Sequence, residues 1–237
     1  MSLCRLCERA QTSVNAHIIP KSFFVEHLED GEIPKLIATT EEFYPRKSPI
    51  GVYDPNILCG ACEARFSPYD DYGYRFFHET AATEILHPGT EAEAEVFRGV
   101  DYKLLKLFIL SVLWRASVSQ QTFYAGVRLG RYESEIRELI LSDAPGIVRE
   151  FPIMLHRFSY PPRLIPILCP VASRIAGLNF HQLLLNGFLV LTKVDQRPLP
   201  HLFSEIALAP DKPLIVLPKD YKGSIEHQIM LRAVQNA

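Results

Sequence analysis

Two stretches of the chain place hydrophobic residues at helical spacing. Between residues 101 and 120, apolar side chains recur three and four positions apart behind Asp101, which is a candidate N-cap. These apolar positions are Leu104, Leu105, Phe108, Val112, Leu113 and Ala116. A second helix is predicted over Tyr132–Leu141, where charged residues alternate with an apolar stripe, and a last one near Ser224–Val234.

After Phe151 the pattern changes to short apolar runs bounded by proline or glycine, which predict strands. The clearest runs are Leu164–Leu168, Gly187–Val194 and Leu214–Leu217. Residues 1–98, in contrast, contain many turn signals and few long apolar runs. We therefore expect an α+β fold, in which an N-terminal module of residues 1–98 packs on a helical segment and a β-rich C-terminal region within residues 99–237.

No apolar run reaches the about 20 residues that cross a bilayer. The best candidate, Leu104–Trp114, is interrupted by Lys106 and closed by Arg115. We expect the charged groups of Lys103, Lys106 and Arg115 to lie at the margins of this helix. The N-terminus has no apolar signal segment, so we expect a cytoplasmic protein with no membrane partner. The net charge of -2 gives no overall attraction for nucleic acid, which would need a local basic surface.

Four of the five cysteines form two Cys-x-x-Cys pairs, Cys4/Cys7 and Cys59/Cys62. In a reducing compartment this spacing favours a metal site over disulfides, and two pairs supply the four thiolates of a closed tetrahedral Zn²⁺ site. A closed site leaves no position for water, so the ion would be structural. The competing interpretation is four unrelated thiols. Cys169 is predicted to be a separate buried thiol.

Two segments accompany the cysteines: NAHIIPK at residues 15–21, and DPNIL at residues 54–58 directly before the second pair. Over residues 4–66 this combination resembles the HNH, or His-Me finger, nuclease superfamily. It is most similar to members with four zinc-bound cysteines, such as phage Holliday-junction resolvases and some restriction enzymes, and to bacterial HNH-like proteins. The resemblance implies a ββα-metal fold and a metal-dependent endonuclease that hydrolyses phosphodiester bonds in DNA.

The same resemblance assigns roles to three residues. His17 would be the general base, because an imidazole titrates near neutral pH and can take a proton from the attacking water. Asn56 would orient or support the loop of the histidine. Glu63 would bind a catalytic Mg²⁺ or another divalent ion, for which a carboxylate oxygen is a suitable ligand.

The chain departs from the family at Ala16, where an acidic residue or histidine usually supplies another metal ligand. Substitute ligands are Asp54, Asp70, Asp71 and His78. The departure leaves a second hypothesis open: a catalytically inactive zinc-binding module for nucleic-acid or protein interaction, for example in a bacterial or phage defence system. Each site residue also has a structural interpretation: His17 as a core histidine, Asn56 as a turn residue, and Glu63 and Asp70 as helix N-terminal acids.

Basic residues near the motif are candidates for phosphate contacts. Lys21 and Arg65 are the foremost of these, and Lys35, Arg46 and Lys47 are further ones; the competing interpretation is a solvated surface. The aromatic run from Tyr69 to Phe77 is assigned to the core. The C-terminal region is expected to position the substrate or to bind a protein partner.

Overall fold

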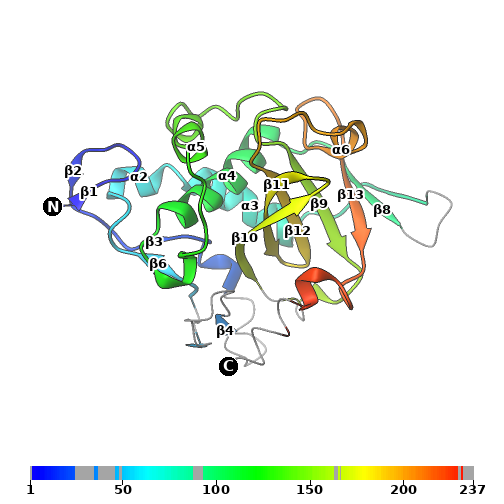
Figure 1. The fold of residues 1–237 in the computed structure, drawn as a ribbon, viewed down its shortest axis with the longest axis horizontal. Coiled ribbons are helices and arrows are strands. Elements are labelled where there is room, and N and C mark those ends of the chain that lie inside the picture. The colour runs from blue at the N-terminus through cyan, green and yellow to red at the C-terminus, as the bar shows by residue number, and fades with distance from the viewer. Residues whose placement is uncertain are drawn as a thin grey trace.

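The computed structural model describes residues 2–24, 35–36, 46–47, 50–87, 93–162, 165, 167–228 and 231, and it shows an α+β fold around a seven-stranded sheet (Figure 1). Its strands are β7 (Glu84–Leu86), β8 (Ala94–Phe97), β9 (Ile153–Phe158), β10 (Leu168–Ile175), β11 (Leu178–Leu185), β12 (Phe188–Lys193) and β13 (Leu214–Lys219). Their order is β10-β11-β12-β9-β13-β8-β7. All neighbours are antiparallel except β9 and β13, which are parallel.

Two tight turns connect β10, β11 and β12. Ala176 and Gly177 have φ angles of 49° and 77°, and Asn186 and Gly187 have 42° and 78°. Two consecutive positive φ angles are what a two-residue hairpin turn of type I′ requires, and Asn-Gly is a favoured sequence for it. The Asn186 side chain also donates a hydrogen bond to the Phe77 carbonyl oxygen at 2.7 Å. This contact fixes the β11–β12 turn to a helix on the other side of the core.

The helices are α2 (Gly60–Ala64), α3 (Ser67–His78), α4 (Tyr102–Val118), α5 (Tyr132–Leu141) and α6 (His201–Ile206), with a 3₁₀ turn at Thr122–Tyr124. The predicted helices over 101–120 and Tyr132–Leu141 are confirmed, and the Asp101 side chain caps α4 by accepting from the Leu104 N–H at 2.9 Å. A helical turn follows Ser224, but the end of the predicted last helix lies outside the described residues, as do Leu164 and Pro166 of the first predicted strand.

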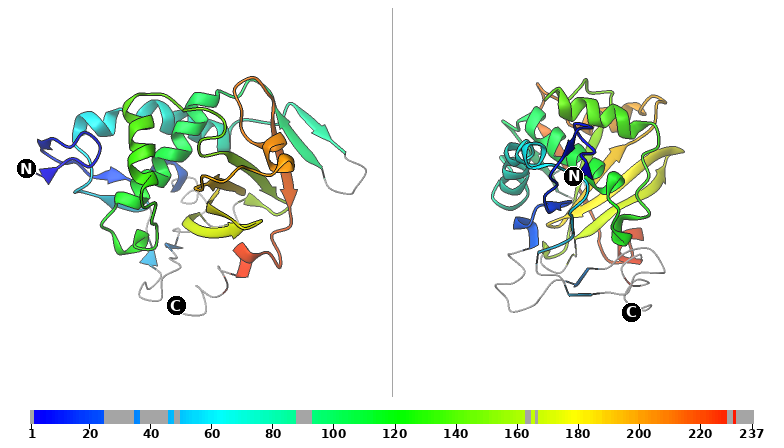
Figure 2. Two further views of the ribbon diagram at one scale, coloured as in Figure 1. Left: turned by 45° about the horizontal axis from the view of Figure 1, so that its top comes forward. Right: turned by 90° about the vertical axis from the view of Figure 1, so that its left-hand side faces the viewer.

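Helix α4 lies at the centre of the molecule, between the N-terminal segment and the sheet (Figure 2). Every residue from Leu105 to Ala116 is buried, which is the pattern of a helix surrounded by protein on all sides. Helix α3 crosses it closely because Gly73 has no side chain: a Cβ there would lie 2.4 Å from the Phe108 ring. No helix among the described residues is long and apolar enough to cross a membrane.

The expected position of two basic residues at the margins of α4 is wrong. Lys106 and Arg115 are 2% and 0% exposed. Lys106 is buried because its ammonium group has three partners, the Tyr102 hydroxyl at 2.9 Å and the carbonyl oxygens of Ile147 at 2.9 Å and Glu150 at 2.7 Å. Burial lowers its pKa to about 8, and only the charge of Glu150 opposes the shift.

The two faces of the sheet bury different clusters. One face packs on the helices, and its cluster extends from Cys4 and Leu6 through Phe77 and Trp114 to Val216. The other face forms a smaller cluster of Met154, Phe158, Ile165, Leu178, Phe180, Leu184, Leu189, Leu191, Ala207 and Tyr221. The larger cluster therefore joins residues from both sides of the predicted boundary at residue 98, and β7 and β8, which precede it, belong to the main sheet. Cys169 is buried, as predicted.

His181 on β11 is buried, and neither ring nitrogen has a partner within the described residues. Burial lowers its pKa from 6.5 to about 4, so the unfolded chain binds a proton more readily than the folded chain between these values. The contribution of His181 to the free energy of unfolding is therefore fully present well above pH 6.5, and it is lost by about 1.4 kcal/mol for each pH unit between 6.5 and 4.

We expect the free energy of unfolding of a His181→Leu variant, relative to that of the wild type, to rise by about 1.4 kcal/mol as the pH falls from about 7.5 to about 5.5. Urea unfolding at both pH values measures this difference, and changes common to both proteins cancel. The exposed His201, changed to leucine, is the control and is expected to follow the wild type. If the wild type and His181→Leu lose the same free energy of unfolding between the two pH values, the prediction is contradicted.

Candidate functional site

The first cysteine pair lies on a short hairpin formed by β1 (Ser2–Leu3) and β2 (Ala10–Gln11). The turn closes through the Glu8 N–H, which donates to the Cys4 carbonyl oxygen at 2.8 Å, and the Cys4 N–H, which donates to the Arg9 carbonyl oxygen at 3.1 Å. Glu8 has a φ of 56°, so the chain reverses immediately after Cys7. This turn directs both thiols to the same side.

The second pair lies at the start of α2, where Cys59 is the N-cap and Cys62 belongs to the first turn. Backbone hydrogen bonds join this segment to the first hairpin: the Arg5 N–H donates to the Ile57 carbonyl oxygen at 2.8 Å, and the Val14 N–H donates to that of Leu58 at 3.0 Å. The two pairs are therefore brought together by main-chain pairing between segments about fifty residues apart.

The ligand atoms of Cys4, Cys7, Cys59 and Cys62 lie within 4.8 Å of one another. Four sulfur atoms that each lie about 2.3 Å from one tetrahedral ion would be about 3.8 Å apart, so this cluster could bind a metal ion such as zinc. Within the described residues it is the only group of three or more histidine, cysteine or acidic side chains arranged in this way.

The backbone around Cys4 favours the thiolate form of this residue. Burial raises the pKa of Cys4, but the N–H groups of Cys7, Cys59 and Leu6 lower it more, to about 7. The Cys59 N–H donates to the Cys4 sulfur at 3.4 Å. Burial and the neighbouring thiols raise the pKa of Cys62. The thiolate is the form that binds metal.

His17 lies on β3 (Ala16–His17), which pairs antiparallel with β6 (Tyr53–Asp54), the strand that precedes α2. Its Nε2 atom is buried and has no hydrogen-bond partner within the described residues. Burial, Arg115 and Lys21 all lower the pKa of the imidazole. These three effects favour the neutral ring, which is the form that can accept a proton.

Glu63 follows Cys62 on α2 and lies beside the same strand. The N–H of His17 donates to its carboxyl group, whereas Oε2 is buried and has no partner in the described part of the chain. Burial and the nearby charge of Asp70 raise the pKa of Glu63, and Arg115 and the His17 N–H lower it. The structure thus brings His17 and Glu63 together, each with one buried polar atom that lacks a hydrogen-bond partner among the described residues.

Arg115 of α4 organises the surroundings of this pair. Its guanidinium group donates to the His17 carbonyl oxygen at 2.9 Å and to both carboxylate oxygens of Asp70 at 2.6 and 3.0 Å. It also lies 4.8 Å from the centre of the Phe66 ring and contacts Ser111. This role of Arg115 was not predicted from the sequence, although an arginine within a helix that is apolar on every side is a signal of a buried ion pair.

Asp70 and Asp54, two of the substitute ligands, already have partners. Asp70 is held by Arg115 and lies in the first turn of α3, as its structural interpretation as a helix N-terminal acid expects. Asp54 is buried and accepts from the Asn56 N–H at 2.9 Å, the Ser119 hydroxyl at 2.9 Å and the Gln120 N–H at 2.7 Å. It therefore fixes the end of α4 to the turn before α2.

The remaining predicted residues lie in different surroundings. Asn56 is exposed in the turn that Asp54 closes. Lys21 is exposed and near enough to lower the pKa of His17, whereas the Arg65 guanidinium donates to the Leu141 carbonyl oxygen at 2.7 Å at the end of α5. His78 stacks on Tyr74 with ring centroids 4.4 Å apart, and Asp71 is exposed. The side chains of Lys35, Arg46 and Lys47 lie outside the described residues.

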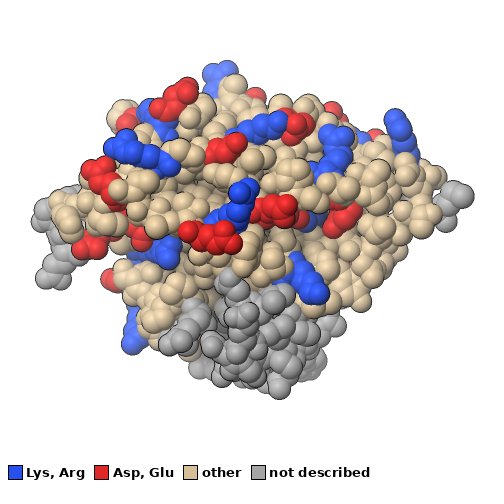
Figure 3. All heavy atoms as spheres, turned by 180° about the vertical axis from the view of Figure 1, so that it is seen from behind, with Lys and Arg blue, Asp and Glu red and all other residues tan. Residues whose placement is uncertain are grey.

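The charged side chains on one face are mixed in sign. Figure 3, which views the molecule from behind, shows lysine and arginine interspersed with aspartate and glutamate. That face therefore has no extended basic surface among its described residues. Comparisons with known protein families, with curated proteins and with solved structures found no match.

Proposed function

We propose that this chain is a metal-dependent endonuclease of the HNH type, which hydrolyses phosphodiester bonds in DNA and whose fold contains a structural zinc ion. The observation that carries the proposal is that His17 Nε2 and Glu63 Oε2, on neighbouring elements, are both buried and have no hydrogen-bond partner among the described residues. Such orphaned groups are rare in folded proteins and point to a ligand or a catalytic role.

The local backbone supports this proposal. The antiparallel pair of β3 and β6, followed by α2, resembles a ββα motif with a long insertion between its strands, with His17 on the first strand and Glu63 on the helix. Cys59 and Cys62 begin the same helix, so a zinc ion there would fix the position of Glu63 relative to His17.

In the proposed reaction, His17 Nε2 accepts a proton from a water molecule as the water oxygen bonds to phosphorus. The bond from phosphorus to the leaving 3′ oxygen breaks, and that oxygen takes up a proton from solvent. Glu63 Oε2 is the oxygen that would hold a divalent ion, and Mg²⁺ often uses one or two carboxylates together with water and phosphate oxygens. When bound, the ion would stabilise the developing negative charge.

Two observations favour the second candidate function, a catalytically inactive zinc-binding module for nucleic acid or a protein partner. Ala16 is completely buried and offers no ligand, and Asp70 is committed to Arg115. A divalent ion would therefore depend on Glu63 alone among the acids that contact this site.

A supercoiled-plasmid nicking assay with Mg²⁺, Mn²⁺ or Ni²⁺ tests the proposal. We expect the wild type to nick with at least one metal, His17→Ala to lose about 10²–10⁴-fold of that rate, and Glu63→Gln to need a higher metal concentration. His201→Ala, which changes an exposed histidine on α6, is the control and is expected to retain the wild-type rate. A wild type inert with every metal would favour the inactive module, and an unimpaired His17→Ala would exclude His17 as the base.

A further inference from the structure

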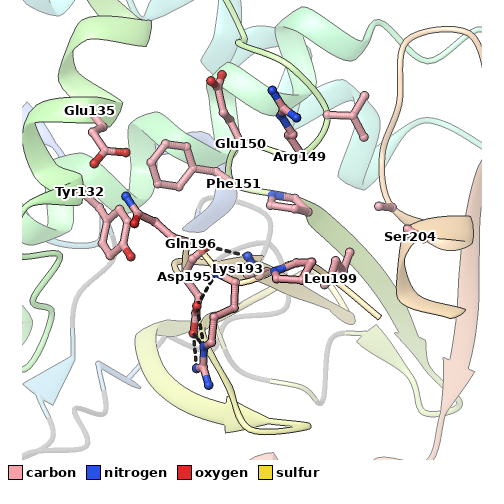
Figure 4. A pocket seen from close by; sticks show the side chains of 15 residues that line it. Tyr132, Glu135, Arg149, Glu150, Phe151, Lys193, Asp195, Gln196, Leu199 and Ser204 are labelled. Carbon is pink, nitrogen blue, oxygen red and sulfur yellow. Dashed lines mark hydrogen bonds and ion pairs between the residues drawn. The ribbon is translucent and has the colours of Figure 1, made fainter. Parts of the chain in front are cut away.

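A hollow in the C-terminal half has the size of a small-molecule site. Its volume is about 620 Å³, and it lies between the start of α5, residues 148–152, the segment after β12 and α6 (Figure 4). Ligand pockets in proteins typically measure about 300–1,000 Å³. The proposed nuclease chemistry uses none of the residues that line it.

Lys193, the last residue of β12, contributes a buried cation to this hollow. It is 2% exposed, and its ammonium group donates to the Asp195 carbonyl oxygen at 2.5 Å. The Asp195 carboxylate is itself engaged by Arg197, so no ion pair of Lys193 with a carboxylate is found among the described residues. Burial and the charge of Arg197 lower the pKa of Lys193, and the charge of Asp195 raises it. An anionic ligand would add a second opposite charge beside this buried ammonium group.

Apolar side chains form the wall beside this cation. Phe151, Pro152, Leu199 and Ala207 line the hollow, and the Phe151 ring meets Tyr132 edge to face with centroids 6.0 Å apart. Phe151 has a φ of 47°, a left-handed conformation that is strained for a bulky residue. Strained residues held in place by their surroundings cluster at functional sites.

We propose that this hollow binds a small organic anion whose flat apolar body lies against Phe151 and Leu199 and whose acidic group contacts the Lys193 ammonium. The protein supplies an aromatic wall, the buried cation of Lys193 and the exposed Arg149, and the exposed acids Glu135 and Glu150 line the same hollow. Figure 4 shows Lys193 in the middle of the labelled residues, with Phe151 and Leu199 on either side. The site gives the C-terminal half a binding function that does not depend on the nuclease proposal.

Fluorescence titration with anilinonaphthalene sulfonate, an aromatic anion, tests the site, and phenylnaphthylamine serves as its neutral analogue. We expect one sulfonate site per chain, bound at least about tenfold more tightly than the neutral analogue. Lys193→Met is expected to weaken sulfonate binding about tenfold or more and to leave the neutral analogue unaffected. Lys212→Met, at an exposed lysine away from the hollow, is the matched control and is expected to bind like the wild type.

A second variant keeps the test decisive if Lys193→Met folds poorly. Ser204→Phe, at an exposed position on α6, fills the hollow and should weaken both probes. Unchanged sulfonate binding in Lys193→Met or in Ser204→Phe, or equal affinity of the wild type for both probes, would overturn the proposal.

Competition then identifies the acidic group. Displacement of the fluorescent sulfonate by benzoate assigns a carboxylate ligand, and displacement by phenyl phosphate alone assigns a phosphate monoester. Benzyl alcohol, which has a similar ring without a charge, should not displace it. Failure of both anions to compete would also overturn the proposal.

Discussion

Replacing Arg115 with methionine is expected to lower the free energy of unfolding by about 3–5 kcal/mol, which is the usual cost of removing one partner of a buried ion pair. The variant leaves the Asp70 carboxylate in a largely buried position without its counter-ion, and it leaves the His17 carbonyl oxygen without a donor. Burial already raises the pKa of Asp70, and Arg115 is the main group that opposes this shift. Urea unfolding at neutral pH measures the loss.

Two further variants separate the lost charge pair from lost packing. Arg115→Met combined with Asp70→Leu removes both charges, and since apolar replacement of a buried pair is often neutral, it should recover most of the stability. Lys103→Met breaks the exposed pair with Asp143 and should cost less than about 1 kcal/mol. A single Arg115→Met variant as stable as the wild type would show that Asp70 does not depend on this arginine.

Loss of the four-cysteine site is expected to have an effect of similar or greater size. Purified wild type should contain one zinc ion per chain, and Cys59→Ser should lose both the zinc and the cooperative thermal transition. Structural zinc sites in small domains have apparent binding free energies of about 10–16 kcal/mol, which rivals the whole stability of a typical domain. Cys4, Cys59 and Cys62 also belong to the main apolar cluster, so the disturbance extends into the core.

Metal analysis and thermal unfolding followed by circular dichroism measure these two effects. Cys169→Ala is the matched control, because Cys169 is a buried cysteine outside the cluster. The Cys169→Ala variant should retain zinc. Any fall in its unfolding temperature should be no larger than that caused by the small cavity left by the missing sulfur atom. A Cys59→Ser variant that unfolds at the wild-type temperature would show that the cluster does not support the fold.

The parts of the fold that the sequence predicted depend on local patterns. The bounds of α5, the Asp101 cap of α4 and the strands around Gly187 and Leu214 follow from hydrophobic spacing and capping residues. The cysteine cluster was predictable because paired spacing describes the ligand geometry directly.

The missed features depend on contacts between distant segments. The ion pair of Arg115 with Asp70 exists because α3 crosses α4 at Gly73, and no local pattern encodes that crossing. The same holds for the parallel pairing of β9 with β13, which are separated by three other elements of the sheet and by α6. In the sequence, Lys193 is an ordinary residue at the end of a strand. Its burial and its hydrogen bond to the Asp195 carbonyl oxygen depend on the tertiary structure around it.

The apolar cluster that extends from Cys4 to Val216 couples the two halves of the chain thermodynamically. When a protein unfolds as one unit, a ligand that binds only the native state stabilises every part of it, by about 2.7 kcal/mol at a concentration one hundred times its dissociation constant. A metal ion at the cysteines and an anion beside Lys193 would therefore each protect the other's site against unfolding, although no direct contact joins them.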